Sequence, residues 1–277
     1  MLTGVFFHKE FIGKNWPIVG NRYAGFEKII EKFSKDPNIV VIEPEPVSEE
    51  LLLKVHTKEL LEEQKKAWYY HGARLTVGGF VKACEMVWKG ELRNAVIFLV
   101  AAGHHASKSS AWGGTYLSCI GPALVRLREL GLKRLALIDT DAHHGDGDRD
   151  VIKGDKDVLH ICFCWRDVKE DDGTKICVNV RDVIGSDEGY LKKVRDTFPI
   201  IKDFKPEMIV HFFGHDTHWN DYGSLGLSED FYIKLAKEVK ELAEEICKGK
   251  YVILDGGGAN REVGEYIWPR IIEILKG

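Results

Sequence analysis

The sequence predicts an α/β protein in which a central, mostly parallel sheet is flanked by helices on both faces. Short apolar runs rich in branched and aromatic residues alternate with longer stretches whose apolar residues recur about every 3.6 positions. Strands that alternate with helices form parallel sheets through right-handed crossovers. No repeat, low-complexity segment or Pro/Gly/Ser-rich linker divides the chain, so we assign residues 1–277 to a single domain.

Four apolar runs have the character of buried parallel strands. Each is short, is rich in branched or aromatic residues, and is bounded by glycine or polar residues. In chain order they are Ala95–Val100, Arg134–Asp139, Met208–Phe213 and Tyr251–Leu254.

Six stretches between and around these runs have the apolar spacing of amphipathic helices. Ser228, followed by Glu229 and Asp230, resembles an N-cap with an acidic first turn. The six stretches are Glu49–Trp68, Leu75–Trp88, Cys119–Leu130, Asp187–Phe204, Ser228–Lys248 and Glu262–Lys276.

The composition narrows the class of protein. The 13 Phe, 9 Tyr and 7 Trp exclude a disordered chain, and the net charge of −4 gives no basic field for nucleic acid or an anionic membrane. The six scattered Cys predict buried thiols in a reducing compartment. Without a signal peptide pattern or an uncharged run of about 18 residues, we expect a cytoplasmic protein with no membrane span. The single Gln among many Lys and Glu fits a heat-adapted protein.

Histidine, aspartate or glycine residues follow each of the four predicted strands. One such residue usually caps a helix or satisfies a loop, but parallel strands bring all four ends to one edge, where ligands bind. Burying several ionisable groups there is costly unless they pair or hold a metal. The segments in question are Gly103–Ala106, Asp139–Gly147, Gly214–Asp221 and Asp255–Asn260.

The Asp-x-His spacing of Asp141 and His143 is suited to chelation, because alternate residues of an extended segment face the same way. Asp216, from another strand end, is a candidate third ligand. Two carboxylates and one imidazole with an open position form a catalytic type of site for a divalent metal such as Zn²⁺. The pair His104 and His105 would then act as acid/base groups. Candidates to orient them are Asp139 and Asp146.

With these residues the chain resembles the histone deacetylase-like family of the arginase/deacetylase fold. The matching segments keep the family's order and spacing, and the Asp-x-His-His-Gly-Asp-Gly run is specific. Weaker matches are Val55–Leu60 and Thr76–Phe80. The stronger matches, which with these cover most of the chain, are Gly103–Ala106, Ile138–Gly147, Gly214–His218 with Asp221 and Gly226, and Gly256–Gly258.

The resemblance implies a zinc-dependent amidohydrolase that removes an acetyl or similar acyl group from a small N-acylated amine. A metal-bound water would attack the amide carbonyl, with His105 as general base and one of the two histidines protonating the leaving amine. A monovalent cation near the Asp139 segment is a further family feature. The implied ligands of one Zn²⁺ per chain are Asp141, His143 and Asp216, and the implied histidine–carboxylate pairs are His104 with Asp139 and His105 with Asp146.

The chain departs from the family at Ala259, where active deacetylases have a tyrosine that polarises the substrate carbonyl. Loss of one such donor commonly costs about 10²–10³ in rate. Three residues of the neighbouring loop are candidates to replace it. We rank His218 first, ahead of Tyr222 and His215.

A second departure concerns the substrate channel. Gly114 stands in the place of a tunnel-wall phenylalanine, and Cys164-Trp165-Arg166 replaces a later Phe-rich loop. A narrow apolar tunnel for an acetyl-lysine stem is therefore not expected. Trp112, Trp165 and Trp219 are candidates to wall a pocket of different shape, although a Trp in a chain of this size is more often core.

Two other functions compete with amide hydrolysis. A binuclear ureohydrolase needs an Asp two positions after His143 and another two positions after Asp216, where Gly145 and His218 stand. A metal-bearing binding protein that is non-catalytic or very weakly active is the alternative that Ala259 suggests. The intact ligand set and histidine pair favour hydrolysis.

Overall fold

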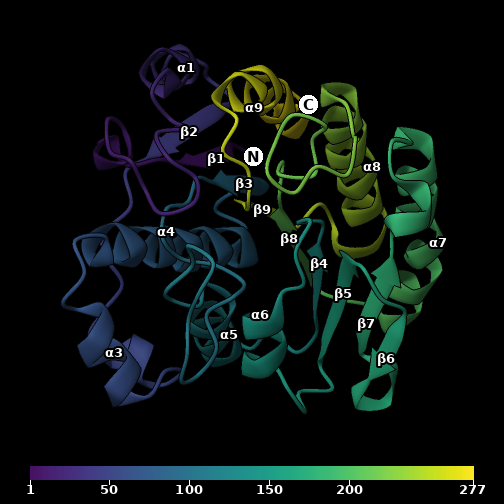
Figure 1. Ribbon diagram of the computed structural model, residues 1–277, viewed down its shortest axis with the longest axis horizontal. Helices are drawn as coiled ribbons and strands as arrows, with labels where there is room; N and C mark the ends of the chain where they lie inside the picture. The colour runs from purple at the N-terminus through teal and green to yellow at the C-terminus, as the bar shows by residue number, and fades with distance from the viewer.

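One sheet of nine strands runs through the computed structural model, which describes residues 1–277 (Figure 1). The strands lie in the order β2-β1-β3-β9-β8-β4-β5-β7-β6, and every neighbouring pair is parallel except β6 and β7. Their bounds are β1 Thr3–Phe6, β2 Ile39–Ile42, β3 Asn94–Ile97, β4 Leu135–Asp139, β5 Val158–Cys164, β6 Val168–Glu170, β7 Lys175–Asn179, β8 Met208–Phe213 and β9 Tyr251–Asp255.

The four predicted strands are confirmed as β3, β4, β8 and β9, and they lie side by side at the centre of the sheet. All residues of these strands are buried, which is why they read as unbroken apolar runs. β3 ends at Ile97, so Phe98–Val100 continue beyond the sheet toward the carboxyl edge. The other five strands add to both sides of this central group.

Helices cover both faces of the sheet, as the sequence predicts (Figure 1). On one face α4 packs on β3, β9 and β1, with α5 against it; on the other, α9 contacts α1 and α8, and α8 contacts α7. The helices are α1 Phe26–Ser34, α2 Glu49–Leu53, α3 Lys58–Gln64, α4 Tyr70–Lys89, α5 Ile120–Glu129, α6 Asp146–Val151, α7 Asp187–Phe204, α8 Glu229–Cys247 and α9 Arg261–Lys276, with 3₁₀ turns at Lys9–Phe11, Asp171–Gly173 and Arg181–Val183.

The prediction of one helix over Glu49–Trp68 is wrong, because the chain forms two short helices there. α2 ends at Leu53, and α3 begins after Thr57, whose hydroxyl accepts a hydrogen bond from the Leu60 N–H at 3.3 Å. Between them, the buried ring of His56 bonds the Ser107 carbonyl and the Ser118 N–H, both at 2.9 Å. A hydroxyl cap satisfies N–H groups that an uninterrupted helix would bond internally.

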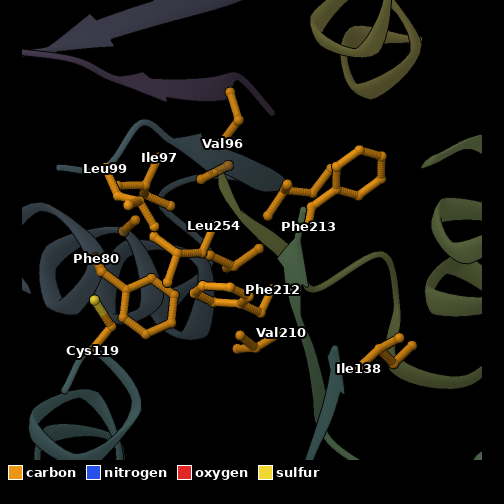
Figure 2. Close-up of a cluster of buried hydrophobic side chains, with 14 of the residues drawn as sticks. Phe80, Val96, Ile97, Leu99, Cys119, Ile138, Val210, Phe212, Phe213 and Leu254 are labelled. Atoms are coloured by element: carbon orange, nitrogen blue, oxygen red, sulfur yellow. The ribbon is translucent and has the colours of Figure 1, made fainter. Parts of the chain in front are cut away.

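The core between α4 and the sheet reaches the carboxyl edge where the polar segments gather. Phe80 of α4 packs near Phe212 of β8 and Leu254 of β9 (Figure 2). Phe212 also stacks on the ring of His104, with centroids 4.2 Å apart and planes at 15°. Apolar packing thus sets the position of an ionisable side chain. None of the helices combines the length and apolar character needed to span a membrane.

Candidate active site

The loops that follow β3, β9, β8 and β4 enclose a cavity of about 190 Å³ at the carboxyl edge of the sheet. Because these strands are neighbours and parallel, residues far apart in the chain meet at this edge. The cavity is lined by five polar groups that the sequence singled out and by apolar residues from the N-terminal segment, including Ile18 and Val19. The five are His104, His105, Asp141, His143 and Tyr222.

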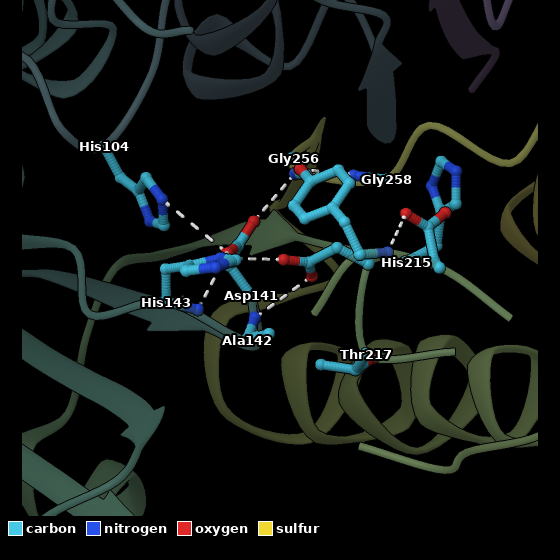
Figure 3. Close-up of polar contacts among 12 residues, drawn as sticks. His104, Asp141, Ala142, His143, His215, Thr217, Gly256 and Gly258 are labelled. Carbon is cyan, nitrogen blue, oxygen red and sulfur yellow. Dashed lines mark hydrogen bonds and ion pairs between the residues drawn. The ribbon is translucent and has the colours of Figure 1, made fainter. Parts of the chain in front are cut away.

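Asp141, His143 and Asp216 converge on one point, as expected from their positions after β4 and β8. His143 Nδ1 lies 3.1 Å from Asp141 Oδ1 and 2.9 Å from Asp216 Oδ2. Both carboxylates are buried. Figure 3 shows Asp141 and His143 turned toward one another, with His104 facing them.

Backbone N–H groups hold the far oxygens of the two carboxylates. The Gly257 N–H donates to Asp141 Oδ2 at 2.8 Å, and the Ala142 N–H donates to Asp216 Oδ1 at 3.1 Å. Asp216 Oδ2 is buried and has no hydrogen-bond partner, because its close contact with His143 lacks hydrogen-bond geometry. A buried, unsatisfied carboxylate oxygen that faces a second carboxylate and an imidazole fits a divalent cation, for which this donor set is suited.

The pKa values of Asp141, His143 and Asp216 also indicate that a positive charge at this point is favourable. Burial and the charge of Asp141 raise the pKa of Asp216 to about 7. Burial also acts on Asp141, but His104 and His143 outweigh it and keep the pKa of Asp141 well below its usual range. The adjacent carboxylates of Asp141 and Asp216 raise the pKa of His143 to about 10. A cation placed among the three groups would relieve the repulsion between the carboxylates.

His104 and His105 stand side by side, with ring centroids 4.1 Å apart, and each is held by its own carboxylate. His104 Nδ1 lies 2.9 Å from Asp139 Oδ2, and His105 Nδ1 lies 2.6 Å from Asp146 Oδ1. These are the pairs that the sequence resemblance implies. A carboxylate on Nδ1 sets the tautomer and leaves Nε2 for chemistry.

The two histidines differ in charge. Burial lowers the pKa of His104, but Asp139 and Asp141 outweigh it and raise the value to about 9. For His105, burial and the charge of His104 lower the pKa, against the raising effect of Asp146. His105 is therefore neutral at pH 7 and able to accept a proton, while His104 is the better proton donor.

Close backbone contacts place this pair. A Cβ at Gly147 would lie 2.4 Å from backbone atoms of His105 and Ala106, and one at Gly145 would lie 2.5 Å from Asp139 Oδ2. The glycines of the Gly-Asp-Gly run therefore allow the loop after β4 to lie directly against the histidine segment.

Trp112 closes one side of the cavity. It is 51% exposed, its ring lies 4.0 Å from that of His105, and its Nε1 donates to Asp146 Oδ2 at 2.9 Å. Trp165 lines an adjoining groove of about 490 Å³ with Arg166, whereas Trp219 lines neither space. Of the three tryptophans predicted to wall a pocket, Trp112 and Trp165 therefore line one, and Trp219 does not.

Comparison with known proteins identifies the family. Residues 68–275 match the model of the histone deacetylase domain. The chain belongs to the histone deacetylase family. It is 29% identical to a probable deacetylase of Archaeoglobus fulgidus over 93% of this chain and 81% of that protein. It is 27% identical to a histone deacetylase-like amidohydrolase of Pseudomonas aeruginosa over 84% of this chain and 69% of that protein.

The crystal structure of the HDA15 HD domain has the same fold, with a TM-score of 0.86 and 19% identity over 99% of this chain and 89% of that one. The expected arginase/deacetylase-like architecture is confirmed. The protein is accordingly a deacetylase-type hydrolase of amide bonds.

The structure does not bring His218 to this cavity. His218 is 1% exposed; its Nδ1 accepts a hydrogen bond from the Asn220 N–H at 3.1 Å, and its Nε2 lies 3.4 Å from Glu229. His215 is also buried and lies behind Gly258, beside Asp255. The residue of this loop that lines the cavity is Tyr222, so the ranking of His218 first is not supported by its position.

Sequence reasoning missed Arg22, which supports the glycine-rich loop that follows β9. Its guanidinium is buried and donates to the carbonyls of Gly256 at 2.7 Å and Gly258 at 2.9 Å. It also forms an ion pair with Asp255 at 3.2 Å. A lone arginine in a loop before α1 carries no local pattern that would show this contact, which spans more than 230 positions of the chain.

Proposed function

We propose that the protein is a zinc-dependent amidohydrolase that removes an acetyl or similar acyl group from a small N-acylated amine. The observation that carries the proposal is the convergence of Asp141, His143 and Asp216 beside two carboxylate-held histidines. This arrangement supports one metal at this point, because Asp141, His143 and Asp216 form the one group of potential ligands in the chain that contains two carboxylates.

Asp141, His143 and Asp216 would hold the ion, and His104 and His105 would move protons. A bound Zn²⁺ supplies Lewis-acid activation of a water molecule and of the amide carbonyl. His105, neutral and held by Asp146, accepts the proton of the attacking water. His104, held by Asp139 and charged, donates a proton to the nitrogen of the leaving amine.

The shape of the cavity supports a small acyl group. A volume of about 190 Å³ between Phe212, Trp112 and the N-terminal segment is large enough for an acetyl group and its amide nitrogen. The amine portion would extend past Trp112 and Tyr222 into the adjoining groove, since these two side chains line both spaces.

Metal analysis and a substrate screen test the proposal. We expect close to one zinc per chain after reconstitution, as a mononuclear site requires, and release of acetate from at least one member of a panel of N-acetylated amines, amino acids, polyamines and sugars. His105→Ala should retain zinc and lose turnover, because it removes the proposed base. His71→Ala, whose ring is exposed on α4, is the matched control. Bound zinc without turnover on any panel member would support a non-catalytic binding protein instead.

A further inference from the structure

Amide hydrolysis places negative charge on the former carbonyl oxygen, and a preorganised hydrogen-bond donor at that oxygen commonly contributes about 10²–10³ in rate. Among the cavity side chains outside the ligand set and the histidine pair, three carry a donor: Trp112, Thr115 and Tyr222. Trp112 Nε1 donates to Asp146, and Thr115 Oγ1 donates to the Trp112 carbonyl at 3.3 Å. The Tyr222 hydroxyl has no acceptor for its proton in the structure.

We infer that the Tyr222 hydroxyl is the donor that polarises the substrate carbonyl and stabilises the oxyanion in this protein. The inference rests on the proposed amidohydrolase function and deepens it. It assigns the role to the loop after β8, and not to the glycine-rich loop after β9 where Ala259 stands.

The position of the phenol oxygen supports this assignment. A Cβ placed on Gly257 would lie 2.7 Å from Tyr222 Oη, 2.4 Å from Asp141 Oδ2 and 3.0 Å from Asp216 Cγ. The phenol oxygen and two of the proposed metal ligands therefore surround the same small space. A carbonyl oxygen drawn to a metal between those carboxylates would come within reach of the phenol.

The phenol oxygen is also oriented. It accepts a hydrogen bond from the Gly258 N–H at 2.9 Å, so one of its lone pairs is occupied. Its own proton then points away from the backbone of the glycine-rich loop. A donor fixed in this way needs no reorganisation as charge develops.

Asp221 clamps the two loops together next to this contact. Its carboxylate accepts hydrogen bonds from the Ala259 N–H at 3.0 Å and the Asn260 N–H at 2.8 Å. The ring of Tyr222 lies against that of His143, with centroids 5.7 Å apart. Tyr222 is thus tied to the loop that lacks a tyrosine and to a proposed metal ligand.

The hydroxyl acts as a donor and not as a proton source. The O–H bond stays intact through the reaction, and its hydrogen bond strengthens as the carbonyl oxygen gains charge. No group is transferred, so the role requires no co-reactant.

Tyr222→Phe tests the inference by removing the hydroxyl and keeping the ring. On the best substrate of the panel, kcat should fall about 10²–10³-fold with KM changed by less than about fivefold, because the lost interaction forms mainly in the transition state. Zinc stoichiometry and melting temperature should stay at the wild-type values. Tyr266→Phe, at an exposed tyrosine of α9, is the matched control and should keep full activity.

A binding measurement gives a readout that does not depend on turnover. A trifluoromethyl ketone analogue of the same substrate hydrates to a tetrahedral species that places an oxygen at the oxyanion position. Calorimetry should show its affinity for Tyr222→Phe reduced at least about tenfold relative to wild type, whereas the affinity for acetate, which is planar, should change little.

The outcomes separate the two proposals. Suppose that the wild type turns over substrate and that His105→Ala abolishes this turnover. If Tyr222→Phe then keeps kcat and analogue affinity within about threefold of wild type, the role of Tyr222 is overturned and amide hydrolysis still stands. If the zinc-loaded wild type hydrolyses no panel member, both proposals are overturned. If Tyr222→Phe loses bound zinc together with its activity, the residue supports the metal ligands and the donor role is overturned.

Discussion

Replacing Arg22 with methionine should both destabilise the protein and loosen its metal site. The guanidinium makes an ion pair with Asp255 and donates to the Gly256 and Gly258 carbonyls and to the Leu99 carbonyl at 3.0 Å. Methionine fills much of the space and removes all of these donors. The variant therefore leaves the buried Asp255 carboxylate without its ion-pair partner, with the Tyr23 hydroxyl still donating to it, and leaves three buried carbonyls with fewer donors.

Breaking a buried ion pair by removing one partner costs about 3–5 kcal/mol. In a domain of this size each kcal/mol lowers the melting temperature by about 2–4 °C, so we expect a decrease of about 6–20 °C. Arg22 is 3% exposed, so solvent does not screen the loss. Scanning calorimetry on metal-free protein measures the loss of folding stability separately from any effect on metal binding.

The effect on metal follows from the loop that Arg22 holds. The Gly257 N–H, between the two supported carbonyls, donates to Asp141 Oδ2 at 2.8 Å. Loss of a group that orients a metal ligand typically weakens affinity about 10–100-fold. Competition with a zinc-binding dye should show a weakening in this range for Arg22→Met.

Arg270→Met, at an arginine of α9 whose backbone contact is exposed, is the control and should change neither quantity. Arg22→Lys should fall between the control and Arg22→Met, because an ammonium keeps the charge but cannot reach all the carbonyls at once. If Arg22→Met melts within 2 °C of wild type, the buried network does not carry the energy assigned to it.

Three other changes have defined outcomes. Asp216→Ala should abolish zinc binding measured by mass spectrometry, because it removes the carboxylate whose buried oxygen has no other partner. Asp148→Asn tests a buried carboxyl whose pKa is raised to about 7, chiefly by burial. Because the pKa of Asp148 is higher in the folded protein than in the unfolded chain, the unfolded chain releases this proton first, and the wild type loses stability as pH rises from about 4 to 7. The variant should gain up to about 4 kcal/mol at pH 8 and nothing at pH 4 in urea unfolding. Arg166 and Arg181 line the outer groove without carboxylate partners, so Arg166→Gln should lower kcat/KM about tenfold for carboxylate-bearing substrates and spare uncharged ones.

The fold was accessible from the sequence at four strands that are buried along their whole length, although β5 (Val158–Cys164), which is also buried throughout, was not among the predicted strands. β3, β4, β8 and β9 read as apolar runs because each lies at the centre of a parallel sheet. β1 and β2 have four residues each, and three of the four in β2 are only partly buried, so neither leaves a comparable pattern.

The sequence predicted the site residues whose positions are determined by the ends of the strands. Asp141, His143 and Asp216 meet because β4 and β8 are adjacent and parallel. The direction of a side chain within a long loop depends on contacts that no local pattern records. His218 and Tyr222 lie four positions apart, and a backbone bridge between His218 and Leu227 turns the first inward while the Asp221 clamp leaves the second facing the cavity.

The position of Tyr222 decides whether alanine at position 259 argues against catalysis. An oxyanion responds to the place of a donor hydrogen and not to the backbone segment that carries it. Here the loops after β8 and β9 are joined by the Asp221 carboxylate and by the Gly258 N–H on the phenol. A donor on either loop is then held by the same set of contacts. Alanine at position 259 is compatible with hydrolysis when the neighbouring loop supplies the phenol, and for this reason the substitution alone does not favour a binding protein over an enzyme.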